Sequence, residues 1–311
     1  SGQHSAGPTT SSYTGQGRMK PDLVGSSGFT SYATSEVSAA AALLLEVIDN
    51  DSALSAADDP NVIRSILLAA ADKNFRVDWD RADQTKPYDS VFGAGALDAY
   101  RAYYILKGGE QTPSTTTPVN RHGWAAANTF ATRQYRVVVP EGTFAEELSV
   151  ALSWFRQQDG SDGDRPGIEL NLYRVASGGG LELVDRSDSP VDNVEHIFRR
   201  HLPSGEYVIE VPENTFFFDL RAVDYALSWR VELGDGPDLS SNEAGSVEFA
   251  DLDPAAAYTI FRAASPAGPW QVVGTLPAAA RFNATFSDPN PPSGRSFYRL
   301  EWQEPITPVG P

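Results

Sequence analysis

The spacing of apolar residues changes along the chain, from a helical period in the first third to strict alternation beyond about residue 120. Between Ser31 and Asp49 apolar residues recur every three or four positions, which predicts a helix. From Ala39 on, apolar residues occupy nearly the whole circumference of that helix. A helix that is apolar nearly all round is typically buried, so the pattern predicts a buried helix here.

Two further helices are predicted from their end signals. Asp58 or Asp59 can cap a helix that has Pro60 in its first turn and an apolar stripe as far as Ala70. The stretch FGAGALDAYRAYYIL (92–106) predicts a glycine turn that leads into a third helix, ended by Lys107-Gly108-Gly109.

The remaining chain predicts two β modules separated by linkers. Five segments alternate between apolar and polar residues, at 135–139, 148–154, 168–172, 207–211 and 225–231, and they predict an antiparallel sandwich over residues 120–233. Shorter strands at 247–249, 258–260, 270–272, 282–286 and 297–302 predict a second, smaller sandwich over residues 246–311. Turn-forming residues at 110–119 and 234–245 predict the linkers, so residues 1–109 form the first domain.

Composition narrows the functional classes. The 311 residues carry a net charge of −17 without a cluster of Lys and Arg, which argues against a nucleic-acid-binding or anionic-membrane surface. The absence of cysteine excludes disulfides, thiol nucleophiles and thiolate metal sites. No apolar run approaches the ~20 residues of a membrane span, so none is expected. The first residues carry neither a signal-peptide pattern nor an initiator Met, and we expect the chain to be part of a longer precursor.

Three segments in order resemble the serine-bearing part of the subtilisin-like serine proteases. KPDLV (20–24) is similar to a strand motif of that family, TSYAT (30–34) to the segment around its nucleophile, and FGAGALDAYRA (92–102) to its closing segment. PNVIRSILLAAA (60–71) looks like the helix between them. The resemblance implies that residues 1–109 are the C-terminal part of a doubly wound α/β domain with a parallel sheet. A partial sheet of this kind would expose strand edges and a core face.

The resemblance implies that Ser31 is the nucleophile of a Ser-His-Asp triad in an endopeptidase that hydrolyses polypeptides through an acyl-enzyme. A helix N-terminus suits this role, because its free N–H groups and positive dipole end stabilise anions. The other interpretation of Ser31 is a simple helix N-cap. The family's aspartate, histidine and oxyanion motifs are absent from the sequence, so we expect the fragment alone to be inactive and to need the missing N-terminal part of the protease domain as its partner.

Two positions depart from the family pattern. Phe29 replaces a glycine two residues before the serine, and Ser35 replaces a proline four residues after it. They motivate an alternative function, a degenerate protease-like scaffold whose β modules serve binding or structural roles. Of the histidines, His4 lies upstream without a motif, and His122, His196 and His201 are expected at the surface or at strand ends of the β module.

The β modules resemble those that follow the catalytic domain of exported subtilisin-like proteases, and residues 246–303 resemble a fibronectin-type-III-like repeat. The resemblance implies a secreted or cell-surface bacterial protein. Asp159, Asp162 and Asp164 are candidate ligands of a structural calcium ion, with an acidic turn as the alternative; no other cofactor is expected. Asp188, Asp192 and Glu195 are expected at a solvated edge. Four aromatic residues are either core or a carbohydrate platform: Trp270, Phe297, Tyr298 and Trp302.

Overall fold

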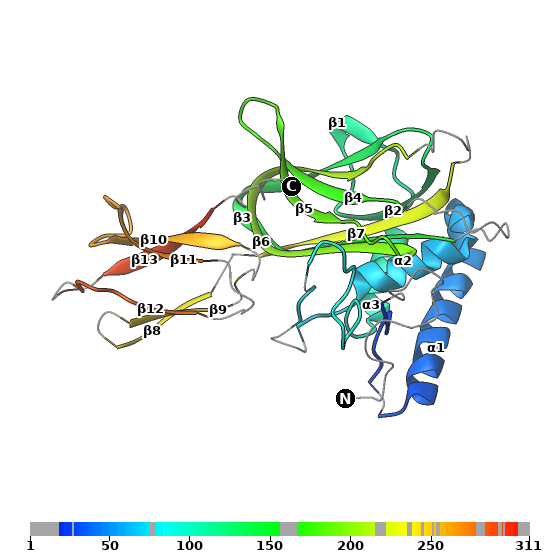
Figure 1. Ribbon diagram of the computed structural model, residues 1–311, viewed down its shortest axis with the longest axis horizontal. Helices are drawn as coiled ribbons and strands as arrows, with labels where there is room; N and C mark the ends of the chain where they lie inside the picture. Colours follow the sequence, from blue (N-terminus) through cyan, green and yellow to red (C-terminus); the bar gives the residue numbers. More distant parts are fainter. Residues whose placement is uncertain are drawn as a thin grey trace. The chain divides into compact units, whose positions relative to one another are not determined.

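The computed structural model describes residues 19–303, in two compact units (Figure 1). The described range has gaps at residues 27, 75–78, 82, 156–166, 215–221, 235–237, 244–245, 251, 253–255, 278–283, 292–293 and 295. Unit 1 consists of residues up to 138, residues 148–198 and residues 205–232. Unit 2 consists of residues 139–147, 199–204 and 233 onward.

The helices of unit 1 begin where local signals favour them. They are α1 (Thr30–Asp49), the 3₁₀ helix η1 (Ser52–Asp58), α2 (Pro60–Ala70) and α3 (Ala99–Lys107). The Asp59 side chain caps α2 by accepting a 2.7 Å hydrogen bond from the Asn61 N–H, and Pro60 occupies the first helical position, as predicted. Gly108 ends α3, also as predicted, and Asp98 caps its start by accepting a hydrogen bond from the N–H of Arg101.

Helix α1 corrects one prediction, because it is largely exposed. Three of its 20 residues are buried, Ala40, Leu44 and Ile48, whereas Leu43 is 59% exposed. The apolar pattern favours packing on most sides of the helix, but the described residues of unit 1 pack against only one side of it. By length and composition α1 would be able to cross a membrane, although only 17% of its most apolar window is buried and core helices of soluble proteins pass the same test. Among the described residues no other helix passes it.

Seven strands form one sheet in the order β2-β7-β3-β6-β4-β5, with β1 on β3. Their bounds are β1 (Ser114–Pro118), β2 (His122–Asn128), β3 (Arg133–Trp154), β4 (Leu170–Val175), β5 (Leu181–Ser187), β6 (Val194–Val211) and β7 (Asp224–Gly234). Strand pairs β2–β7, β4–β5 and β4–β6 are antiparallel, which confirms the antiparallel, sandwich-like character of this region. Strands β1 and β8 (Asp238–Glu243) lie within the segments expected as linkers.

The helices and the sheet of unit 1 share one hydrophobic core. It joins α1, α2 and α3 to residues of four strands, Trp124, Ala151, Val194 and Ala226. Helices α2 and α3 lie against β2 and β7 (Figure 1). The parallel sheet implied for residues 1–109 is not shown, since the described part of that segment contributes only isolated bridges, a parallel one from Val24 to Ala96 and an antiparallel one from Asp72 to Ala96.

Unit 2 contains two three-stranded sheets, β11-β10-β13 and β12-β9-β8. The further strands are β9 (Ser246–Ala250), β10 (Ala257–Ala263), β11 (Gln271–Leu276), β12 (Ala284–Ser287) and β13 (Phe297–Gln303), close to the predicted strands. Val247, Phe249, Tyr258 and Ile260 are buried in their core, and Tyr298 packs against it. Trp270 stacks on the Arg299 guanidinium, 4.6 Å from the ring centre, and the Trp302 side chain lies outside the described residues.

Candidate functional site

The first turn of α1 presents Ser31 to solvent. Ser31 is the second residue of the helix, and the N-cap is Phe29 in an extended conformation, without a hydrogen bond from its side chain. The interpretation of Ser31 as the N-cap is therefore wrong. In the part of the chain that the structure describes, no hydrogen bond to the Ser31 hydroxyl is found, so this hydroxyl lies free beside the positive end of a five-turn helix.

The loop before α1 is fixed against the helix by Glu36. Both carboxylate oxygens of Glu36 accept hydrogen bonds from Ser26, one from its N–H and one from its hydroxyl, each at 2.8 Å. Gly25 permits this close approach, because a Cβ atom at its position would lie 2.9 Å from the Ala33 Cα. The loop therefore closes over the first two turns of the helix and sets where Ser31 is presented.

The two departures from the family pattern are both exposed. Phe29 is 60% exposed and contacts Tyr32 edge-on, with 6.1 Å between the ring centres. The Ser35 hydroxyl donates a 3.0 Å hydrogen bond to the Ser31 carbonyl oxygen. Ser35 thus bonds back to the carbonyl four residues earlier, a contact that slightly destabilises a helix and does not replace the rigidity of a proline.

Two of the segments that carry the family resemblance, 20–24 and 92–102, are joined to one another. The Val24 N–H donates to the Gly95 carbonyl oxygen (3.0 Å), and the Leu97 N–H donates to the Val24 carbonyl oxygen (2.9 Å). Ala96 also exchanges two 2.8 Å backbone hydrogen bonds with Asp72, at the end of α2. Segments that are about 70 residues apart in the sequence are thus joined by backbone hydrogen bonds directly upstream of α1.

The described residues supply no general base for Ser31. His4 lies outside the described residues. His122 begins β2 and is half-buried, as expected of a strand-end residue. His196 and His201 were expected near the surface, which is wrong: they are 0% and 1% exposed within β6.

His196 does contact a serine, at 3.3 Å between its Nε2 atom and the Ser149 hydroxyl. Both residues are fully buried in the sheet. Burial, reinforced by the positive charges of Lys73 and Arg81, holds the pKa of His196 well below its usual range. A neutral imidazole enclosed by Trp79 and Tyr88 is inaccessible to a polypeptide substrate, so this pair is a core contact and not a catalytic dyad.

The acidic group expected at a solvated edge is buried, which corrects that prediction for two of its three members. Glu195 is 0% exposed and Asp192 is 2% exposed. Glu195 accepts hydrogen bonds from the Ser187 hydroxyl (2.5 Å) and the Ser189 N–H (2.7 Å). Partners of this kind are what make buried carboxylates tolerable. The sequence signal was present, since Val194 and Ile197 flank Glu195 and His196 without a turn residue.

The calcium candidates Asp159, Asp162 and Asp164 lie outside the described residues. Within the described ranges, no group of three or more His, Cys, Asp or Glu residues is arranged to hold a metal ion.

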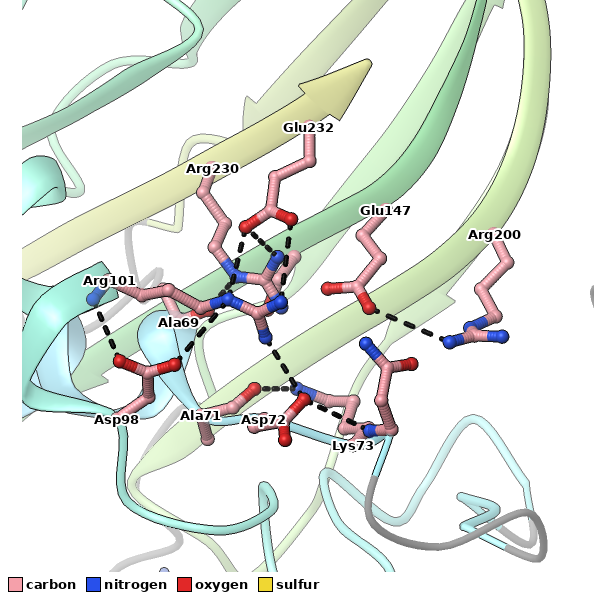
Figure 2. Close-up of polar contacts among 12 residues, drawn as sticks. Ala69, Ala71, Asp72, Lys73, Asp98, Arg101, Glu147, Arg200, Arg230 and Glu232 are labelled. Carbon is pink, nitrogen blue, oxygen red and sulfur yellow. Dashed lines mark hydrogen bonds and ion pairs between the residues drawn. The ribbon is translucent and has the colours of Figure 1, made fainter. Parts of the chain in front are cut away.

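A charged network between α2, α3 and β7 was not predicted from the sequence (Figure 2). Arg230 is fully buried and donates to the Ala69 carbonyl oxygen at 3.0 Å, at the end of α2. Arg230 also pairs with Glu232 at 2.8 Å, and Glu232 pairs with Arg101 of α3 at 3.2 Å. Arg101 reaches Asp72 at 3.0 Å as well, so one network ties both helices to the sheet.

The same face of β7 makes contacts at every second residue. The Ser228 hydroxyl lies 2.7 Å from the Ser65 hydroxyl of α2, followed by Arg230 and Glu232. Alternate residues of a strand point to one face, so a polar residue at every second position of a buried strand was the available signal.

An open groove of about 530 Å³ lies between α1 and α3. Its apolar walls include Leu43, Leu44, Val47 and Tyr103, and the Lys107–Asp51 ion pair (2.7 Å) lies at its rim. Tyr100 and Tyr104 extend the aromatic surface of α3 and are 70% and 46% exposed.

No protein-family profile and no curated protein sequence matches the chain. Among solved structures, it is similar to a mitogen from Yersinia pseudotuberculosis (14% identity, TM-score 0.23, covering 40% of this chain and 91% of that one). It is also similar to a periplasmic inhibitor of g-type lysozyme from Aeromonas hydrophila (18%, 0.22, 35% and 82%) and to a protein from Sulfurospirillum deleyianum (7%, 0.22, 35% and 97%). TM-scores this low carry no information on function.

Proposed function

We propose that this chain is the nucleophile-bearing C-terminal part of a subtilisin-like serine endopeptidase, with Ser31 as the nucleophile. The observation that carries the proposal is the exposed Ser31 hydroxyl in the first turn of α1, shortly after the family-like segment 20–24, which backbone hydrogen bonds join to the family-like segment 92–102. A cap or a core serine would not be presented in this way.

The chemistry follows from this position. The Ser31 oxygen attacks a peptide carbonyl while a histidine takes its proton, and the backbone N–H of Ser31 helps to stabilise the oxyanion. The leaving amine then takes the proton from the histidine, and water hydrolyses the acyl-enzyme. The reaction needs no cofactor, and a calcium ion would serve only structure.

The histidine and aspartate would come from the rest of the protease domain, N-terminal to this chain. The exposed apolar side of α1 and the groove beside Leu43 and Tyr103 suit the packing of such a partner. In this proposal the protein acts on polypeptides outside the bacterial cell, as the family resemblance implies.

Phe29 and Ser35 favour a second candidate, a protease-like scaffold without activity. Phe29 stands beside Ser31 where a smaller residue would leave more room for substrate, and its ring covers Tyr32. In this case the sheet of unit 1 and the two sheets of unit 2 would carry the function as binding or structural modules.

A fluorophosphonate probe separates the two candidates, with the labelled residue identified by mass spectrometry. In the full-length protein that contains this chain, we expect labelling at Ser31, its loss in Ser31→Ala, and unchanged labelling in Ser38→Ala, an exposed serine two turns further along α1. The 311-residue chain alone should not react. An unlabelled full-length protein, or equal labelling of Ser31→Ala, would overturn the protease proposal and support the scaffold.

A further inference from the structure

The hairpin between β5 and β6 joins two buried carboxylates through one serine. The Ser189 N–H donates to Oε1 of Glu195 at 2.7 Å, and the Ser189 hydroxyl donates to Oδ2 of Asp192 at 2.8 Å. Oδ1 of Asp192 in turn accepts the N–H of Met19 at 2.8 Å, 173 residues away in the sequence. The hairpin therefore holds the start of the segment that leads to α1.

Two negative charges this close together in a buried hairpin would repel one another. Glu195 also lies near Asp188 of the same hairpin and near the phenol of Tyr88, from the loop that packs on it. Two arginines near Tyr88 and His196 are paired with other carboxylates: Arg81 binds Asp185 at 2.5 Å, and Arg64 binds Asp22 at 3.1 Å. Inside a protein such repulsion is weakly screened, so one carboxyl is best kept neutral.

Both carboxylate oxygens of Glu195 accept a hydrogen bond within the hairpin. Oε1 accepts the Ser189 N–H, and Oε2 accepts the Ser187 hydroxyl at 2.5 Å. These two bonds favour the ionised form and oppose the burial and the repulsion that favour the neutral acid. Burial, with a further contribution from Asp192, raises the pKa of Glu195 to about 8.

We propose that Glu195 is a proton-operated latch. While Glu195 is neutral, the hairpin of Ser189 and Asp192 stays closed on the backbone of Met19. When Glu195 loses its proton, repulsion from Asp192 and Asp188 opens the hairpin and releases Met19, which loosens the chain upstream of Ser31. The latch does not depend on the proposed protease function, because its test needs no catalysis.

The difference in the pKa of Glu195 between the closed and the opened hairpin sets how the closing equilibrium depends on pH. Glu195 in an opened hairpin regains its ordinary pKa near 4.5, while in the closed hairpin its pKa is about 8. The closed form therefore binds the proton more tightly, and its stabilisation is complete below pH 4.5 and lost as the pH rises towards 8. In this window the opening equilibrium grows up to about tenfold per pH unit, and above pH 8 it levels off.

The test is amide hydrogen exchange on the 311-residue chain between pH 5 and 9, expressed as protection factors so that the intrinsic pH dependence of exchange is removed. We expect the protection of Met19 and Ser189 to fall up to about tenfold per pH unit to pH 8 and then to level off. Glu195→Gln, which mimics the neutral acid, should make both protection factors independent of pH. Glu141→Gln, at an exposed glutamate, should behave as the unmodified chain does.

Two results would overturn the latch. One is a pH-independent protection factor for Met19 in the unmodified chain, which does not depend on how well any variant folds. The other is an equal loss of protection at Leu67, in the buried helix α2, because this would show that Glu195 titrates with global unfolding and not with the hairpin.

Discussion

Helices α1 and α2 have similar apolar sequences but different surroundings. Nine of the 11 residues of α2 are buried, whereas three of the 20 residues of α1 are. Helix α2 lies against β2 and β7, whose buried face supplies Ser228 and Arg230 as partners. Helix α1 has only its Ala40, Leu44 and Ile48 side covered. The comparison shows that an apolar pattern alone does not determine how much of a helix is buried. The tertiary fold decides whether other segments pack against its apolar residues.

The largest difference in stability between the two helices is expected when one apolar residue in each is replaced. Ile66 of α2 is fully buried, so Ile66→Ala should lower the free energy of unfolding by about 2–5 kcal/mol in urea titrations. Leu43 of α1 is 59% exposed, and Leu43→Ala should change it by less than about 0.5 kcal/mol. Equal effects of the two substitutions would contradict the described burial of α1.

A smaller effect is expected from the polar anchor of α2. Arg230→Met removes the donor to the Ala69 carbonyl oxygen from a fully buried position, so we expect a loss of about 1–3 kcal/mol in the same titration. As a control, Arg299→Met changes a 44%-exposed arginine that pairs with Glu301, and it should cost at most about 1 kcal/mol. If Arg230→Met left the free energy of unfolding unchanged, the network would not be needed to hold α2.

The smallest effect concerns the caps of the two helices. Asp59→Ala removes the side-chain cap of α2 and should cost about 1 kcal/mol. Phe29 at the N-cap of α1 makes no side-chain cap, so Phe29→Ala should change the stability by less than about 0.5 kcal/mol. Circular dichroism during urea unfolding measures both, and a cost for Phe29→Ala as large as that for Asp59→Ala would show that its ring supports the helix.

Features set by neighbouring residues were predictable from the sequence. The Asp59 cap, Pro60 in the first turn and Gly108 at the end of α3 depend on local geometry, and each was predicted. The alternation of apolar residues likewise predicted most strands of both units, because a strand buried on one face needs that period, but it missed β1, β2, β5 and β8. The position of Ser31 in the first turn of α1 follows from the same local signals.

Features set by distant segments were not predictable. Glu195 and His196 were interpreted as surface residues because charged groups are rarely buried. The partner of His196, Ser149, is 47 residues away in the sequence, whereas Ser187 and Ser189 lie close to Glu195 in the same hairpin. The exposure of α1 was missed in the same way. Its pattern alone indicated burial, but three of its 20 residues are buried.

The division of the chain between the two units limits how unit 2 could be exchanged between proteins by recombination. Unit 2 is assembled from three separate stretches, residues 139–147, 199–204 and 233 onward, and the first two are the middle parts of β3 and β6. A module acquired by joining two genes at one junction would occupy a single stretch. Exchanging unit 2 between proteins would thus require three coordinated replacements, so recombination at one site would not transfer it intact.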